Sequence, residues 1–175
     1  MKNQKFIVRL MTFISMLSGS LWLGAYAIRM IVCYQLFDIN MNLMSFTNGQ
    51  NLEGILITIM PVINSTFVLY IIFILSFSMF LLLSNIKLRE NGWLFIIVVI
   101  IYFTLPFEAY LMINDYKLIM TLNFSEMIDT NFAITLIRDR FLKLSSFPII
   151  IFLSYCSICY FLIIKPFTLA NKDEN

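Results

Sequence analysis

Four long stretches of the chain carry no charged residue, and they constrain its fold more than any other feature. They cover residues 10–28, 54–86, 91–107 and 144–164. An α-helix needs about 20 mostly apolar residues to cross a bilayer core of about 30 Å. Each stretch is long enough, or can extend far enough, to meet that length. The sequence therefore predicts four membrane-spanning helices.

The composition of the chain agrees with a membrane environment. Hydrophobic residues make up 61% of the 175 residues and charged residues only 13%, whereas soluble domains average about 45–50% and about 25%. A chain this short exposes much of its surface and cannot hide such an excess in a core. We expect an all-α integral membrane protein, a four-helix transmembrane bundle that forms a single transmembrane domain over residues 1–175.

The spans are predicted at about 10–30, 61–83, 93–113 and 144–164. The first follows three basic residues and contains Ala25-Tyr26-Ala27, so it has features of a secretory signal peptide. We expect it to be retained as a span. Small residues recur in it at a spacing of four, which favours close packing of a neighbouring helix. The predicted helix-packing seam consists of Ser15, Gly19, Ser20 and Gly24.

The second span contains a proline followed by three polar residues. Pro61 removes one backbone hydrogen bond, and the polar side chains nearby can offer donors to the freed carbonyl. Either the helix is simply kinked here, or a polar break lines a pathway through the bilayer. The residues concerned are Pro61, Asn64, Ser65 and Thr66.

A further helix is predicted between the third and fourth spans. Residues 125–143 place apolar side chains at roughly helical spacing, with acidic residues near the start and basic residues near the end. We expect an amphipathic interfacial helix that lies on the membrane or on a partner subunit. Arg138, Arg140 and Lys143 would form an interfacial basic cluster.

One acidic residue, Glu108, falls inside the third span. It lies fifteen residues after Trp93, about 22 Å along a helix, and therefore near the far side of the bilayer. Arg29 ends the first span on the same side, so the sequence predicts an intramembrane ion pair between Arg29 and Glu108. Asp115 lies seven residues after Glu108, on the same helix face. Alternatively, Glu108 titrates or guides ions, or it extends to the interface without a role.

The chain contains no histidine, which removes His-ligated haem and metal sites and histidine bases. We expect no catalytic, cofactor-binding or metal-binding residues, although bound phospholipid fits the composition. Cys156 and Cys159 form a C-x-x-C. With four spans, the chain resembles quinone-linked thiol oxidoreductases of the disulfide-bond and vitamin K epoxide reductase type. Those enzymes need a second cysteine pair, and here only Cys33 remains, so we expect no enzyme activity.

Basic residues favour one orientation by a small margin. The N-terminus, the 84–92 connection and the C-terminus hold seven Lys and Arg residues, against five in the other two loops. Basic loops stay in the cytoplasm or matrix. We therefore expect a multi-pass protein of a bacterial inner or organellar inner membrane, with both termini on the cytoplasmic or matrix side.

The function expected from these features is assembly. We predict a small non-catalytic subunit that packs in a larger membrane protein complex and helps to assemble or stabilise it. Its partners would be other membrane subunits and lipids, and no nucleic acid. The alternative is a self-associating ion or proton channel, or a small-molecule transporter, with Glu108 in the pathway.

Overall fold

The described residues of the computed structural model, 2–45, 47, 49–124, 129–142 and 147–168, form five helices and no strand. Four of these helices are long and apolar enough to cross a membrane, so the chain is a multi-pass membrane protein with the predicted all-α architecture. The helices are α1 (Lys2–Tyr34), α2 (Gly49–Leu83), α3 (Gly92–Phe124), α4 (Thr130–Leu142) and α5 (Phe147–Ile164).

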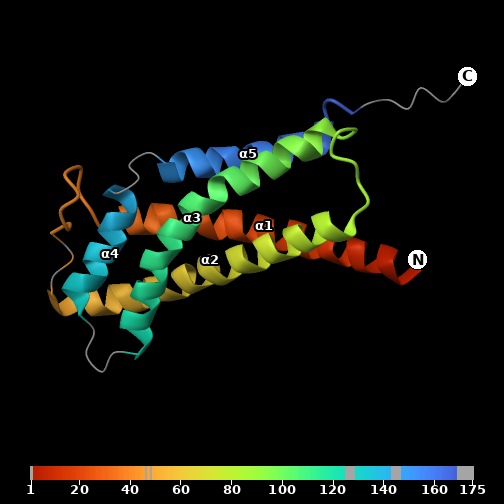
Figure 1. Cartoon of the computed structure of the whole chain (residues 1–175). Helices are drawn as coiled ribbons and strands as arrows, with labels where there is room; N and C mark the ends of the chain where they lie inside the picture. Colours follow the sequence, from red (N-terminus) through yellow and green to blue (C-terminus); the bar gives the residue numbers. More distant parts are fainter. Residues whose placement is uncertain (1, 46, 48, 125–128, 143–146, 169–175) are drawn as a thin grey trace, which may run out of the picture.

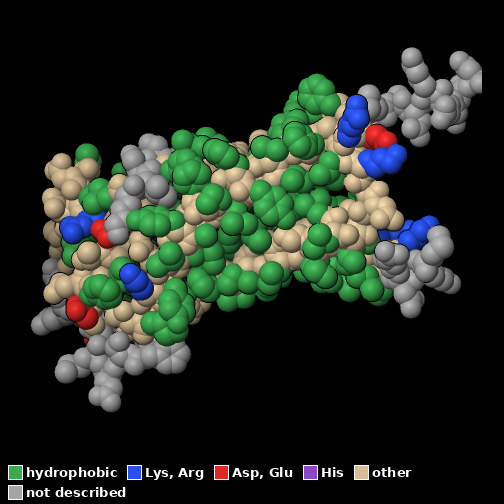
Figure 2. All heavy atoms as spheres, viewed as in Figure 1, with side chains coloured by type: hydrophobic (Ala, Val, Ile, Leu, Met, Phe, Trp, Pro, Cys, Tyr) green, Lys and Arg blue, Asp and Glu red, His purple; other side chains and the backbone are tan. Residues whose placement is uncertain are grey.

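The four long helices form an elongated bundle (Figure 1). α1 and α2 lie side by side along most of their length, and α3 packs against α2 and α5. The start of α1, the α2–α3 connection and the end of α5 gather at one end of the bundle, and α4 crosses the opposite end (Figure 1). Hydrophobic side chains cover the long middle part, whereas the coloured charged side chains lie near the two ends (Figure 2).

α3 changes direction midway along its length (Figure 1). Pro106 lies in this middle part of the helix and leaves the carbonyl of Tyr102 without its helical donor. Such a proline is the usual cause of a bend. The bend carries the second half of α3 across the end of the bundle, where it meets α4.

Two apolar cores fill the bundle. In the first, Trp22 of α1 is 1% exposed, and its ring centroid lies 5.0 Å from that of Tyr70 and 4.7 Å from that of Tyr155. The second core lies under α4 and is mainly aliphatic, with Cys33, Leu56, Leu118 and Ile137 among its buried members. Both cores are built from several helices, so each fixes how the helices pack.

The apolar side of α4 packs against other helices of the same chain. Ala133, Ile134, Leu136 and Ile137 are buried in the second core, against residues of α1, α2 and α3. α4 is the helix predicted between the third and fourth spans, but its apolar side packs against this chain and not, as expected, on the membrane or on a partner subunit. The reason is that the ends of α1, α2 and the bent α3 project together and offer α4 an apolar surface.

α2 runs through Pro61 without interruption, as one helix from Gly49 to Leu83. Pro61 is exposed, so the group it leaves unpaired does not disturb the packing inside the bundle. Thr66 is buried and its hydroxyl donates to the carbonyl of Val62, whereas Ser65 is exposed and Asn64 half-buried. The proposed polar break is therefore a regular stretch of helix whose polar side chains point in different directions.

The predicted packing seam divides into two faces. Ser15 is buried, and a Cβ built on Gly19 would lie 2.9 Å from the ring of Phe73, so this pair lets α1 approach α2 closely. Ser20 and Gly24 are exposed, and nothing lies within 4 Å of a Cβ built on Gly24. The α1 helix thus presents one small-residue face inside the chain and a second one outside it.

Candidate functional site

Four charged side chains from three helices meet at the junction of the two apolar cores. Arg29 comes from α1, Glu108 and Asp115 from α3, and Arg140 from α4. The two carboxylates lie seven residues apart, which places them on one face of α3. All four residues are at least 94% buried, and their formal charges sum to zero. We call these four residues the ion cluster.

Asp115 is the centre of the ion cluster because it binds both arginines. Arg29 contacts both carboxylate oxygens of Asp115, and its Nη1 donates to Oδ2 over 2.7 Å. Nη1 of Arg140 donates to the same Oδ2 over 2.6 Å. Nη2 of Arg140 lies 3.3 Å from Oε2 of Glu108, which is the longer and weaker contact. One carboxylate therefore connects α1, α3 and α4.

The predicted pair between Arg29 and Glu108 is replaced by this cluster. Arg29 pairs with Asp115, and Glu108 pairs with Arg140. The two predicted residues do lie near the same side of the bundle, but the bend in α3 and the arrival of α4 change the partners. The signal for Arg140 is in the sequence, since Arg140 follows the buried Ala133 and Leu136 at spacings of seven and four.

The ion cluster lies near one boundary of the hydrocarbon region. α5 has 18 residues, about 27 Å of helix, which closely matches the thickness of a bilayer core. Near its start, the carbonyl of Pro148 accepts a 3.4 Å hydrogen bond from the hydroxyl of Tyr26. Arg29 lies three residues beyond Tyr26 on α1, so the cluster stands at the level where α5 begins. Buried charges are less costly near this boundary than at the centre of the bilayer.

One carboxylate oxygen of Glu108, the buried Oε1, has no hydrogen bond of normal length to any residue that the structure describes. The Tyr26 hydroxyl interacts with the Glu108 carboxylate at longer range. The buried Tyr70 hydroxyl likewise lacks a hydrogen bond of normal length among the described residues and interacts with Tyr155 at longer range. Another polar contact lies along the bundle from Glu108, where the hydroxyl of Thr104 donates to that of Tyr155 over 3.2 Å. An unsatisfied buried carboxylate oxygen is costly, and in a native protein it calls for an explanation.

Of the three residues in the predicted basic cluster on α4, Arg140 does not lie at the surface. Arg140 is 6% exposed and belongs to the ion cluster. Burial opposes its charge, but Asp115 and Glu108 outweigh this effect and raise the pKa of Arg140 above its usual range. Arg138 is half-buried, and its buried Nε has no hydrogen-bond partner among the residues that the structure describes. Lys143 lies outside the described residues.

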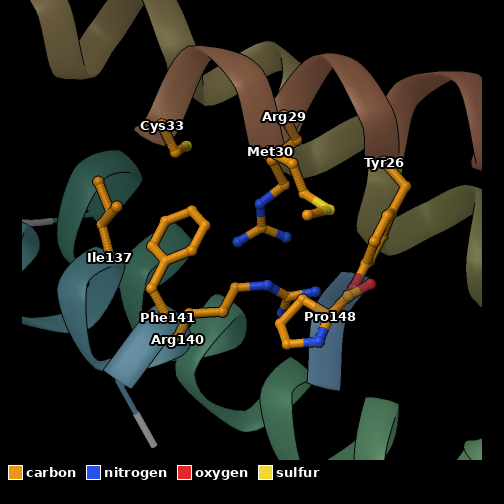
Figure 3. Close-up of a pocket in the computed structure, with 8 residues that line it drawn as sticks. All are labelled: Tyr26, Arg29, Met30, Cys33, Ile137, Arg140, Phe141 and Pro148. Carbon is orange, nitrogen blue, oxygen red and sulfur yellow. The ribbon is translucent and has the colours of Figure 1, made fainter. Parts of the chain in front are cut away.

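The space beside the two arginines is small. Arg29 and Arg140 reach into it from α1 and α4, with Tyr26 and Pro148 on one side and Phe141 on the other (Figure 3). The cavity measures about 10 Å³. That is the volume needed for about one water molecule. This cavity is too small to hold a substrate beside the two arginines, which are already paired with carboxylates of the protein.

The three cysteines are free thiols. Cys33 is buried in the second core, and Cys156 and Cys159 are exposed on α5. No group of three or more acidic or cysteine residues that could hold a metal ion occurs within the part of the chain that the structure describes.

The sequence matches no protein-family model, and neither the curated proteins nor the solved structures contain a match to this chain.

Proposed function

We propose that the chain is a small non-catalytic subunit that packs against other membrane subunits and helps to assemble or stabilise their complex. The observation that carries this proposal is the outward face of α1. In its most apolar 18-residue window, 17% of α1 is buried inside the chain, against 33% in α2 and in α3 and 22% in α5. α1 therefore keeps most of its surface for lipid or for another protein.

The exposed small residues Ser20 and Gly24 favour a protein partner over lipid on the outward face of α1. Helices do not associate in lipid through a hydrophobic driving force, and they rely on close packing at small residues spaced by four. Gly24 has open space above it, so a neighbouring helix can approach its backbone. The ion cluster supports the same role, because its charges pair within the chain and make the bundle a rigid platform.

The location proposed for the protein is a bacterial inner membrane or an organellar inner membrane. The start of α1, the α2–α3 connection and the end of α5 share one end of the bundle (Figure 1). The side chains that the structure describes at this end include five basic ones and the acidic Glu90. Basic connections remain on the cytoplasmic or matrix side. We assign that side to both termini.

Copurification tests the proposed subunit role. The tagged chain, extracted from its native membrane in mild detergent, should carry an unlike membrane protein in a fixed ratio. Gly24→Leu should remove that protein by blocking the close approach. Gly54→Leu on α2 is the matched control, because Gly54 is also exposed with nothing within 4 Å of an added Cβ. Gly54→Leu should retain the protein. A homo-oligomer alone, or equal retention by both variants, would contradict the proposal.

The unpaired oxygen of Glu108 favours a second candidate, a self-associating channel or carrier for ions or protons. In this function Oε1 would accept a proton or a cation that passes along the bundle. Ion or proton flux into liposomes should then fall at least about tenfold in Glu108→Gln, which keeps the shape and removes the charge. Glu53→Gln, at an exposed position at the start of α2, is the control. Absent flux, or equal flux in both variants, would exclude this candidate.

A further inference from the structure

A groove between α1 and α5 occupies the half of the bundle away from the ion cluster. Its volume is about 280 Å³, and it is bordered by all four long helices. Residues of every wall are mostly apolar, among them Leu23, Phe77, Ile97 and Leu162. The few polar lining residues include Thr12, Ser15 and Ser20, and the Thr12 hydroxyl donates to the carbonyl of Val8. An apolar chain is the chemistry that fits such walls.

The groove ends beside a basic rim. Trp93 forms part of its wall, and the ammonium of Lys165 lies over the Trp93 ring, 5.7 Å from the centroid. Arg9 precedes the wall residue Thr12 by three positions and therefore shares its helix face. The charged side chains that the structure describes at this end include Lys5, Arg9, Lys87, Arg89, Lys165 and the acidic Glu90. Figure 2 shows this end with basic side chains around a single acidic patch.

We propose that the groove binds one acyl chain of an anionic phospholipid, whose phosphate lies at the basic rim near Lys165 and Arg9. The groove supplies the apolar site and the rim supplies the charge complement. Trp93 connects them, since an indole at the lipid–water boundary has one apolar side and one polar edge. Basic residues near a membrane surface attract anionic lipids in preference to neutral ones.

This lipid site is independent of the subunit proposal. Ser20 lines the groove and also belongs to the proposed partner face, whereas Gly24 does not line the groove. A partner helix over Gly24 and a lipid chain in the groove are therefore compatible. Gly24→Leu should remove a partner protein and leave lipid binding unchanged, so failure of one proposal is distinguishable from failure of the other.

Quenching of tryptophan fluorescence by brominated lipids tests the site. The protein contains two tryptophans. Trp22 is 1% exposed and does not line the groove, so Trp93 should give the lipid-dependent signal. In vesicles, phosphatidylglycerol with brominated chains should quench more strongly than phosphatidylcholine with brominated chains at the same mole fraction. Trp93→Phe should lose this difference.

Two pairs of variants separate the headgroup from the chain. Lys165→Gln should lower the relative affinity for phosphatidylglycerol about fivefold, whereas Lys117→Gln, exposed at the opposite end, should not. Cys159→Phe should reduce quenching by either lipid because Cys159 lines the groove. Cys156 is exposed on the same helix but does not line the groove, so the Cys156→Phe variant should be quenched as strongly as the unchanged protein.

Three results would each contradict the proposed lipid site. Equal quenching by the two lipids, with no effect of Lys165→Gln, would show that the site does not select an anionic headgroup. Unchanged quenching in Cys159→Phe would show that no acyl chain occupies the groove. Weak quenching by both lipids in the unchanged protein would indicate that another helix fills the groove. If Cys159→Phe does not fold, Ser20→Phe obstructs the same groove from α1 and gives the same comparison.

Discussion

Asp115→Ala should lower the free energy of unfolding by about 3–5 kcal/mol, because it leaves two buried arginines without their shared carboxylate. Arg29 would lose its ion pair with Asp115, and Arg140 would keep only its 3.3 Å contact with Glu108. Burying an uncompensated charge costs far more than losing an exposed ion pair. The measurement is unfolding of the purified protein in mixed micelles as the fraction of dodecyl sulfate rises, followed by circular dichroism.

The control for this prediction is the exposed pair between Lys87 and Glu90. Glu90→Ala removes the 2.9 Å contact to the Lys87 ammonium, and both side chains are at least half exposed. We expect no measurable change in stability. Asp115→Asn is a second variant that keeps the size of the side chain and removes its charge, and it should also destabilise strongly. Wild-type stability in both Asp115 variants would mean that the ion cluster does not hold the helices together.

Trp22→Ala should destabilise the bundle by a similar amount, about 3–5 kcal/mol, by leaving a cavity in the aromatic core. The Trp22 ring contacts rings from α1, α2 and α5, with Tyr26 at 5.1 Å and Tyr155 at 4.7 Å between centroids. Because these rings pack mainly through Trp22, its removal should loosen α5 from α1. The readout is the same micelle titration, together with hydrogen exchange of the α5 amides.

Phe13→Ala is the matched control for Trp22→Ala. Phe13 lies on the same helix and is also aromatic, but it is 62% exposed on the outside of the bundle. In detergent its truncation should change the free energy of unfolding by less than about 1 kcal/mol, since it leaves no internal cavity. Equal destabilisation by the two variants would show that the aromatic core does not depend on Trp22.

The number of spans could be predicted from the sequence because charge is so costly in lipid. Each of the four charge-free stretches overlaps one of the four long helices, α1, α2, α3 and α5. The lengths of the helices were harder to predict. α3 continues to Phe124, beyond the predicted end at residue 113, because Asp115 is neutralised by arginines and no longer marks the end of an apolar segment.

The ion cluster could be predicted only in part. The lengths of the first and third spans place Arg29 and Glu108 near the same side of the bilayer. Asp115 lies on the same helix face as Glu108, seven residues later. Arg140 was assigned to a surface because its neighbours Arg138 and Lys143 are basic too. Which of these three faces the core depends on how α4 docks onto α3, and α4 reaches that place through the bend at Pro106. The spacing of Arg140 from Ala133 and Leu136 places it on the buried side of α4, but the spacing does not tell which carboxylates it meets there.

The exposed small residues illustrate the same limit. Spacing by four predicted a single seam from Ser15 to Gly24, yet the inward and outward parts differ in what they contact. Gly19 lies against Phe73, whereas Gly24 has open space. Helix geometry explains this division, because residues five positions apart point in directions about 140° apart. Only the placement of α2 determines which of the two faces is inside.

A double-mutant cycle between Arg29 and Asp115 tests most directly whether Asp115 is the centre of the ion cluster. Arg29→Ala, Asp115→Ala and the double variant should show a coupling energy of at least about 1 kcal/mol in the micelle titration. The parallel cycle between Arg29 and Glu108, which do not pair directly, should show a smaller coupling. Additive effects of Arg29→Ala and Asp115→Ala, within about 0.5 kcal/mol, would contradict the account.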